Sequence, residues 1–228
     1  AYPDEIGKMD FANRRDAFCG KLGLCAVFKQ MGFKFTSGKP FVMHPLSKDF
    51  EKELREFVSI CRIVKKMKHA RLGIFGARTT AFKSVRFDEG AMEHLGIDTE
   101  CYDLTMIFDK FKTIDENSDD VKFFAEKLEQ TGDFCDTPDY AKKNLAVLGA
   151  TFKAFVDENK LDAIAVRCWS ELQYEYKIAP CALLGIFNQM GIPAVCETDG
   201  SNAVPMLALS LAPGTPCGCL DINNNYGD

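Results

Sequence analysis

The chain has 228 residues, an apolar content of 46% and a formal net charge of −5 at pH 7. That length suits one large α/β domain, or one domain with part of another, and the apolar content is sufficient for a sizeable core. The negative charge gives no general reason to expect nucleic acid or an anionic membrane as a partner, and no apolar run is long enough to span a bilayer.

Ten cysteines are many for this length. No signal peptide opens the chain, so we interpret the thiols as reduced and the protein as cytoplasmic. The chain starts without Met and stops at Asp228 without a helix after the last expected strand, so we expect a fragment of a longer protein. Seven cysteines fall inside apolar patterns and are predicted to be small core residues: Cys61, Cys101, Cys168, Cys181, Cys196, Cys217 and Cys219.

The first part of the sequence predicts helices only. Residues 10–31 carry apolar side chains at helical spacing, and a loop with Gly and Pro follows over 36–45. A second helix is expected over 47–67, with Ser47 as its cap and a single apolar stripe. Residues 1–70 are therefore interpreted as a helical N-terminal segment from an adjoining domain.

From residue 71 the pattern changes to alternating strands and helices. Strands are expected over 72–75, 99–104, 161–167, 192–196 and 215–220, with helices over 85–95, 105–131, from 137 onward and over 178–190. The order predicts an α/β fold over 71–228, with a doubly wound, mostly parallel, five-stranded sheet.

Two carboxylates close the last two expected strands. Glu197 ends the strand over 192–196, Asp221 ends the strand over 215–220, and one helix lies between them. A strand–helix–strand crossover leaves both strands parallel with their carboxyl ends on one edge, and neighbouring strands lie about 4.8 Å apart. The pair could share a divalent cation or act as acid and base. The alternative is that Asp221 only starts a turn and Glu197 only caps the next helix.

Three loops follow strands at the same expected edge: 76–80, 168–173 and 197–202. The first could bind an anion, although its glycines do not form the dinucleotide fingerprint. Trp169 could be a stacking platform for a sugar or a core residue. Arg167 could hold a substrate oxygen, or could pair with Glu171 or Asp162.

Several strings resemble one family. They are Val195-Cys-Glu-Thr-Asp-Gly-Ser-Asn-Ala-Val-Pro-Met-Leu-Ala-Leu209, Gly214-Thr-Pro216 and Leu220-Asp-Ile-Asn-Asn-Asn225, with Arg71-Leu-Gly-Ile-Phe-Gly76, Val85-Arg-Phe-Asp-Glu89 and Ala165-Val-Arg-Cys-Trp-Ser-Glu-Leu172 upstream. Together they resemble the L-fucose isomerase and L-arabinose isomerase superfamily, in particular its fucose isomerase-like branch, over roughly residues 50–225. The most specific element is a Glu and an Asp 24 residues apart.

The resemblance implies a longer chain with two N-terminal α/β domains and a β-rich C-terminal domain. Residues 1–70 then correspond to the end of the first domain, and 71–228 to the second, Rossmann-like domain. Glu197 and Asp221 match two carboxylate ligands of a catalytic Mn²⁺, or another divalent cation, and also the acid/base pair. The third ligand, a His, has no counterpart here. A homo-oligomer that includes the missing C-terminal domain is expected.

The function implied is metal-dependent aldose–ketose isomerisation of a free sugar of the L-fucose or D-arabinose type, through an ene-diol. Trp169, Arg167 and Asn202 are the candidate substrate-binding residues. The N–H groups of Ser201 and Asn202 are expected to steady the charge of Glu197. This chain alone is expected to be inactive if the absent His is essential. Two alternatives remain: a non-catalytic sugar- or anion-binding α/β module, and a phosphate-dependent enzyme that uses the loop at Gly76.

Overall fold

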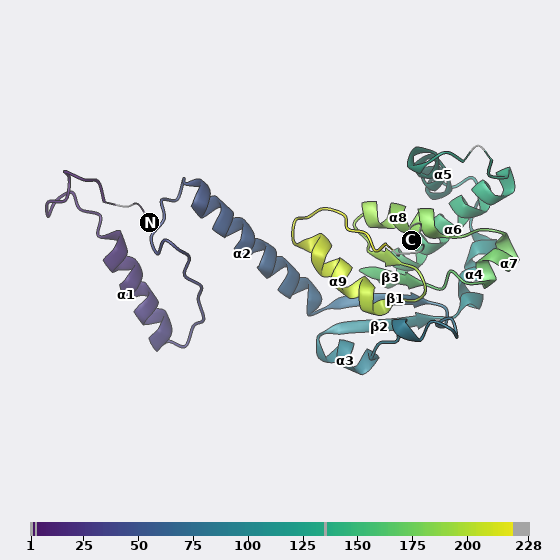
Figure 1. Ribbon diagram of the computed structural model, residues 1–228, viewed down its shortest axis with the longest axis horizontal. Helices are drawn as coiled ribbons and strands as arrows, with labels where there is room; N and C mark the ends of the chain where they lie inside the picture. Colours follow the sequence, from purple (N-terminus) through teal and green to yellow (C-terminus); the bar gives the residue numbers. More distant parts are fainter. Residues whose placement is uncertain (1, 3, 135, 221–228) are drawn as a thin grey trace, which may run out of the picture. The chain divides into compact units, whose positions relative to one another are not determined.

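The computed structural model describes residues 2, 4–134 and 136–220, and the chain divides into two units, 1–61 and 62–228. The first unit contains α1 (Ala17–Gln30) and most of α2 (Lys48–Met67) (Figure 1). The Ser47 hydroxyl accepts a hydrogen bond from the Phe50 N–H at 3.2 Å, which confirms the expected cap of α2. No described residue of this unit is buried.

The second unit is built on a parallel sheet. Its strands are β1 (Ala70–Phe75), β2 (Ile97–Tyr102), β3 (Ala163–Val166) and β4 (Ala194–Val195), in the spatial order β2-β1-β3-β4. In the register, Phe75 lies opposite both Tyr102 and Val166, so the carboxyl ends of these strands meet at one edge. Such an edge is where ligands bind in open α/β sheets.

Helices connect the strands and follow the last one. They are a 3₁₀ turn η1 (Lys83–Val85), α3 (Glu89–His94), α4 (Leu104–Thr113), α5 (Asp119–Thr131), α6 (Asp139–Asn159), α7 (Glu171–Tyr176), α8 (Cys181–Gln189) and α9 (Gly200–Leu211). Among the described residues, no helix is both long and apolar enough to cross a lipid bilayer.

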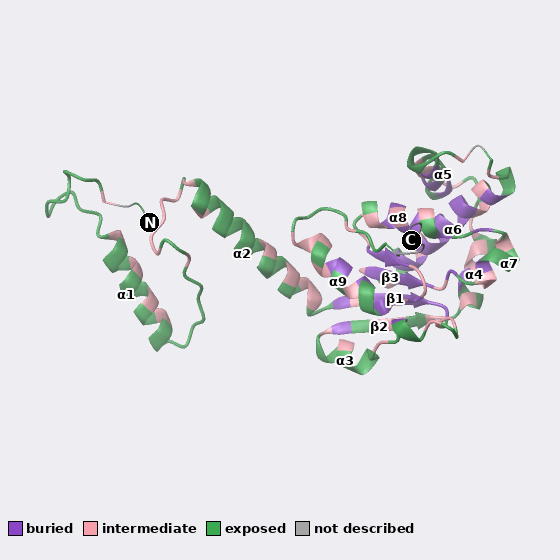
Figure 2. Ribbon diagram, viewed as in Figure 1, coloured by how far each residue is buried: buried purple, intermediate pink, exposed green. Residues whose placement is uncertain are grey.

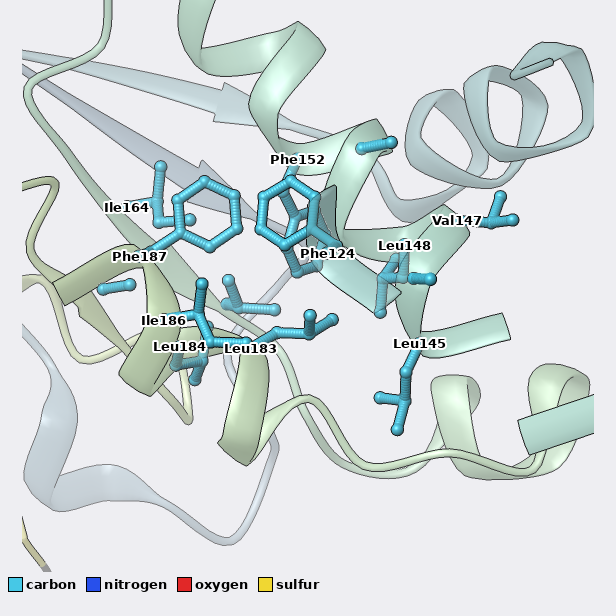
Figure 3. Close-up of a cluster of buried hydrophobic side chains, with 14 of the residues drawn as sticks. Phe124, Leu145, Val147, Leu148, Phe152, Ile164, Leu183, Leu184, Ile186 and Phe187 are labelled. Atoms are coloured by element: carbon cyan, nitrogen blue, oxygen red, sulfur yellow. The ribbon is translucent and has the colours of Figure 1, made fainter. Parts of the chain in front are cut away.

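Alternating side chains of the strands fill two separate cores. Phe75, Ile164 and Val166 pack with α5, α6 and α8 on one face, whereas Leu72 and Ala165 pack with α9 on the other. Figure 3 shows Ile164 among side chains of the first core, such as Phe187. Successive residues of a strand point to opposite faces, so one strand contributes to both cores. The buried residues are therefore concentrated in the sheet and in the helices against it (Figure 2).

The α/β class, the parallel sheet and four of the expected strands are confirmed. The expected fifth strand is not confirmed. The described part of the sheet has four strands, and residues 216–220 have no strand pairing. Pro216 and Gly218 interrupt this segment, and both residues disfavour a strand interior. Helix α7 was not anticipated. The predicted domain boundary at residue 70 stays a prediction.

The prediction that seven cysteines are core residues is wrong for four of them. Cys168 is buried and Cys196 and Cys217 are half-buried, whereas Cys61, Cys101, Cys181 and Cys219 are exposed. Cys101 illustrates the reason: it lies on β2, an edge strand of the described sheet, where an apolar sequence pattern does not guarantee a covering element.

Candidate functional site

Backbone hydrogen bonds bring three loops together at the carboxyl edge of the sheet. The N–H of Gly76 donates to the Tyr102 carbonyl at 2.8 Å, that of Arg167 to the Phe75 carbonyl at 2.8 Å, and that of Thr198 to the Val166 carbonyl at 3.2 Å. The loops over 76–80, 168–173 and 197–202 thus continue the strand register, which places their side chains along one edge as expected from the sequence.

Glu197 lies in a left-handed turn at this edge. Glu197 and Thr198 both have left-handed backbone conformations, with φ of 62° and 56°. Thr198 is β-branched and 2% exposed, and its hydroxyl donates to the Glu197 carbonyl at 2.5 Å. Left-handed non-glycine residues cost about 1–3 kcal/mol each and cluster at functional sites. The fold therefore holds the carboxylate-bearing turn in one specific conformation.

A cavity of 510 Å³ is lined by Glu197 and by residues of α8, the start of α9 and the segment 216–220. We call it the Glu197 cavity. Asp199 and Asn202 also line it. Asp221, the second predicted carboxylate, lies outside the described residues, but Leu220 immediately before it contributes to the lining. Among the described residues, no three His, Cys, Asp or Glu side chains form a group that could hold a metal ion.

Asp199, not Glu197, caps α9. One carboxylate oxygen of Asp199 accepts from the Asn202 N–H at 3.0 Å and from the Ser201 hydroxyl at 2.6 Å, and the other accepts from the Asn202 side-chain amide at 2.7 Å. The alternative that Glu197 caps this helix is therefore wrong. So is the expectation that the Asn202 N–H steadies Glu197, because that donor is directed to Asp199. Asn202 does line the Glu197 cavity, and its predicted role in substrate binding stays a prediction.

Arg167 is anchored within the edge. Its guanidinium forms a two-pronged ion pair with Glu171, at 2.7 and 2.6 Å, and donates to the carbonyl oxygens of Trp169 at 2.8 Å and Ala77 at 3.1 Å. The pairing with Glu171 that the sequence allowed is thus present, whereas Asp162 pairs with Lys66 instead. Arg167 ties the loop after β3 to the loop after β1.

Trp169 is not a core residue. Its side chain is 52% exposed, and its ring meets Phe82 edge-to-face at a centroid distance of 5.8 Å. Its carbonyl also accepts from the Thr79 hydroxyl at 3.4 Å. An indole that is held from one side and open on the other can stack against a ligand.

Two thiols predicted only as core residues, Cys168 and Cys196, meet beside Glu197. Cys196 hydrogen-bonds to Cys168 and, together with the Glu197 N–H, lowers the pKa of the Cys168 thiol to about 7. The same interaction and burial raise the pKa of the Cys196 thiol. No signal in the sequence indicates this pair, because its members are 28 residues apart and become neighbours only through the pairing of β3 with β4.

A second cavity, of 590 Å³, lies at the carboxyl ends of β1 and β2. We call it the arginine cavity, because Arg78 and Arg86 line it. Gly76 begins the lining loop with φ of 90°, and a side chain there would clash with Leu104 and Arg167. Thr198, the neighbour of Glu197, lines this cavity too. The two cavities therefore share one turn of the chain.

Comparisons with known proteins agree with the resemblance found in the sequence. Residues 1–68 match the family described as fucose/sulfoquinovose isomerase, N-terminal domain. The sulfoquinovose isomerases of Priestia aryabhattai and Priestia megaterium are each 24% identical to the chain over 181 residues, which is 79% of this chain and 39% of theirs. That of Alkalicoccus urumqiensis is 24% identical over 163 residues, 70% of this chain and 36% of its own.

This chain thus spans well under half the length of the curated relatives it matches. The family match at its start and the relatives' alignments, which extend over most of its length, point to the same group of proteins. These similarities support the resemblance of the chain to the fucose isomerase-like branch of the L-fucose isomerase and L-arabinose isomerase superfamily.

Proposed function

We propose that the protein is a metal-dependent aldose–ketose isomerase and that Glu197 is one of its two catalytic carboxylates. The observation that supports this most is the strained Glu197–Thr198 turn at the carboxyl end of β4, facing a cavity that the segment leading to Asp221 also lines. The relatives are named as isomerases, which favours chemistry over a module that only binds.

Glu197 and Asp221 would hold the cation, for which Mn²⁺ is the first candidate. Carboxylate oxygens are hard donors that suit Mn²⁺ and Mg²⁺, so the chemistry of the pair fits such an ion. When bound, the ion would stabilise the negative charge that develops on the two sugar oxygens.

The remaining roles, proton transfer and substrate positioning, fall to side chains of this chain. One carboxylate would take the proton from C2 of the open-chain aldose and return it to C1, and the other would assist the proton that moves between the oxygens. Trp169 would cover an apolar face of the sugar. Arg167 would act as a positioning residue, because its donors already fix the loops on either side of it.

The substrate is proposed to be an aldose. The L-fucose and D-arabinose type follows from the resemblance, and the names of the relatives add sulfoquinovose, a sugar that carries a sulfo group. A cytoplasmic homo-oligomer is proposed as well. Light scattering on the purified protein tests the assembly, and a mass equal to that of one chain would contradict it.

The decisive variant is Glu197→Gln, which keeps the shape of the side chain and removes its charge. Loss of general acid–base catalysis should lower turnover by about a hundredfold to ten-thousandfold. Asp199→Asn is the matched control: it removes one charge from the same cavity, and Asn caps helices as well as Asp does. Turnover is followed as aldose converted to ketose.

Chelation provides the independent test. Exhaustive EDTA treatment should abolish turnover, and added Mn²⁺ should restore it. Undiminished turnover after chelation, or an active Glu197→Gln variant, would contradict the proposal.

A further inference from the structure

The arginine cavity holds two cationic side chains that pair with no carboxylate among the described residues. Arg78 donates to the carbonyl oxygens of Thr79 at 2.9 Å and Thr80 at 3.3 Å, and Arg86 donates to that of Lys83 at 3.0 Å. These hydrogen bonds use one nitrogen of each guanidinium, and they hold each guanidinium against a backbone carbonyl of its own loop.

Arg62 of the same unit likewise donates to a carbonyl, that of Leu211, whereas two other arginines pair with carboxylates. Arg71 forms ion pairs with Asp98 and Glu100, and Arg167 forms its ion pair with Glu171. A chain with net charge −5 has carboxylates available for pairing. Arg78 is half-buried and Arg86 is exposed, and the positive charge of the two guanidinium groups that line the cavity favours an anion there.

The two carboxylates of the cavity are already engaged by other groups. Asp103 accepts from the N–H and from the hydroxyl of Thr105, both at 2.8 Å, which lowers the pKa of this carboxyl. Glu89 accepts from the Cys101 thiol at 3.8 Å. The carboxylates are therefore directed to helix α4 and strand β2 rather than to the arginines.

The backbone of the loop adds donors. Ala77 and Arg78 line the cavity, and their N–H groups donate to no backbone carbonyl of the described residues. Free N–H groups at the first turn after a strand, together with arginine side chains, form the donor set that recognises tetrahedral oxyanions.

We infer that the arginine cavity is the subsite for an oxyanion group carried by the sugar, a sulfonate or a phosphate, which Arg78 and Arg86 hold together. The inference rests on the proposed function, since it assigns the reacting end of the sugar to Glu197. Thr198 connects the two places, because it lines the arginine cavity and directly follows Glu197. One strand, β3, lies between β1 and β4, so these two strands are about 10 Å apart. A substrate that occupies both places must span roughly this distance.

The test is calorimetric titration of the full chain in EDTA with sulfoquinovose, glucose 6-phosphate and glucose. Both anionic sugars, or one of them, should bind about tenfold to a hundredfold more tightly than glucose, as expected for charge-assisted hydrogen bonds. Arg78→Gln and Arg86→Gln should each remove about tenfold or more of that preference. The better anionic ligand identifies the group as sulfonate or phosphate.

Lys83→Gln is the matched control. It removes one positive charge from the same stretch of chain, but the Lys83 side chain does not line the cavity, and its backbone carbonyl still accepts from Arg86. An equal loss in Lys83→Gln would show a general charge effect and overturn the inference. So would equal affinity for glucose and the anionic sugars, or unchanged binding in both arginine variants.

The titration separates this inference from the proposed function, because it needs neither metal nor turnover. Arginine-dependent binding, together with isomerisation that survives Glu197→Gln, would support the oxyanion site and contradict the proposed role of Glu197. Mn²⁺-dependent isomerisation without a preference for anionic sugars would do the reverse.

Discussion

Helices α2 and α6 have almost the same length, 20 and 21 residues, and each carries apolar side chains at helical spacing. Eleven residues of α6 are buried, and none of α2 is. Helix α6 lies against the sheet and against α4 and α5, whereas the apolar side chains of α2, such as Leu54 and Phe57, are about half exposed (Figure 2).

The comparison of α2 with α6 shows that an apolar helix face and a buried helix face are different properties, which the sequence pattern alone does not distinguish. Periodicity indicates which face of a helix is apolar, whereas burial requires another element to cover that face. Because burial supplies most of the stabilising free energy, the two units should respond very differently to the same kind of substitution. Trp169 is the single tryptophan, so its fluorescence reports on the second unit alone.

The largest effect is expected for Phe124→Ala. Phe124 is fully buried and stacks on Phe187 at a centroid distance of 5.4 Å, so its truncation should lower the free energy of unfolding by about 3–5 kcal/mol. Phe57→Ala is the matched control on α2, where the ring is 51% exposed, and it should cost less than about 1 kcal/mol. Urea unfolding measures both losses, followed by Trp169 fluorescence for Phe124→Ala and by circular dichroism for Phe57→Ala. Equal losses would break the comparison.

Gly149→Ala should cause the next largest loss in the free energy of unfolding. A β-carbon at Gly149 on α6 would lie 2.5 Å from the ring of Phe124, so the two helices would have to move apart at a cost of about 1–3 kcal/mol. In α1 the same change at Gly23 meets no atom within 4 Å and should favour the helix by up to about 1 kcal/mol. Circular dichroism of the two variants, with urea unfolding, should show opposite signs.

Two helix caps allow a smaller test. The Ser118 hydroxyl accepts from the Val121 N–H at 3.4 Å at the start of α5, and Ser118→Ala should lower the stability of the second unit by about 1 kcal/mol. Ser47→Ala removes the same kind of cap from α2, and the transition reported by Trp169 should not shift. A matching shift in Ser47→Ala would mean that the two units unfold together.

The smallest effect is expected when residues 1–61 are deleted. No described residue of this segment is buried, so the remaining residues should keep their cooperative transition, with a change within about 0.5 kcal/mol. Loss of the transition would show that the first unit contributes to the core of the second.

The sequence was sufficient for the architecture and for part of the site. Periodicity and Gly or Pro breaks located four strands and the helices between them, and the position of Glu197 after β4 follows from that order. The left-handed turn at 197 and 198 could not be foreseen, because neither residue is glycine and the turn is held by a long-range hydrogen bond from the Thr198 N–H to the Val166 carbonyl of β3.

Other features depend on long-range contacts in the same way. By sequence position, either Asp199 or Glu197 could cap α9, and only the structure shows that Asp199 does so. Helix α7 is six residues long, too short for a clear periodic signal, and its role is to supply the partner of Arg167. The role of Asp221 stays a prediction.

The shared turn between the cavities has a thermodynamic consequence. The backbone angles of Glu197 and Thr198 connect a residue that lines one cavity with a residue that lines the other. Any occupant that shifts these angles changes the affinity at the neighbouring cavity, and linkage requires the factor to be the same in both directions. Cooperativity between two ligands can thus be built into a single peptide unit, without a hinge or a subunit boundary.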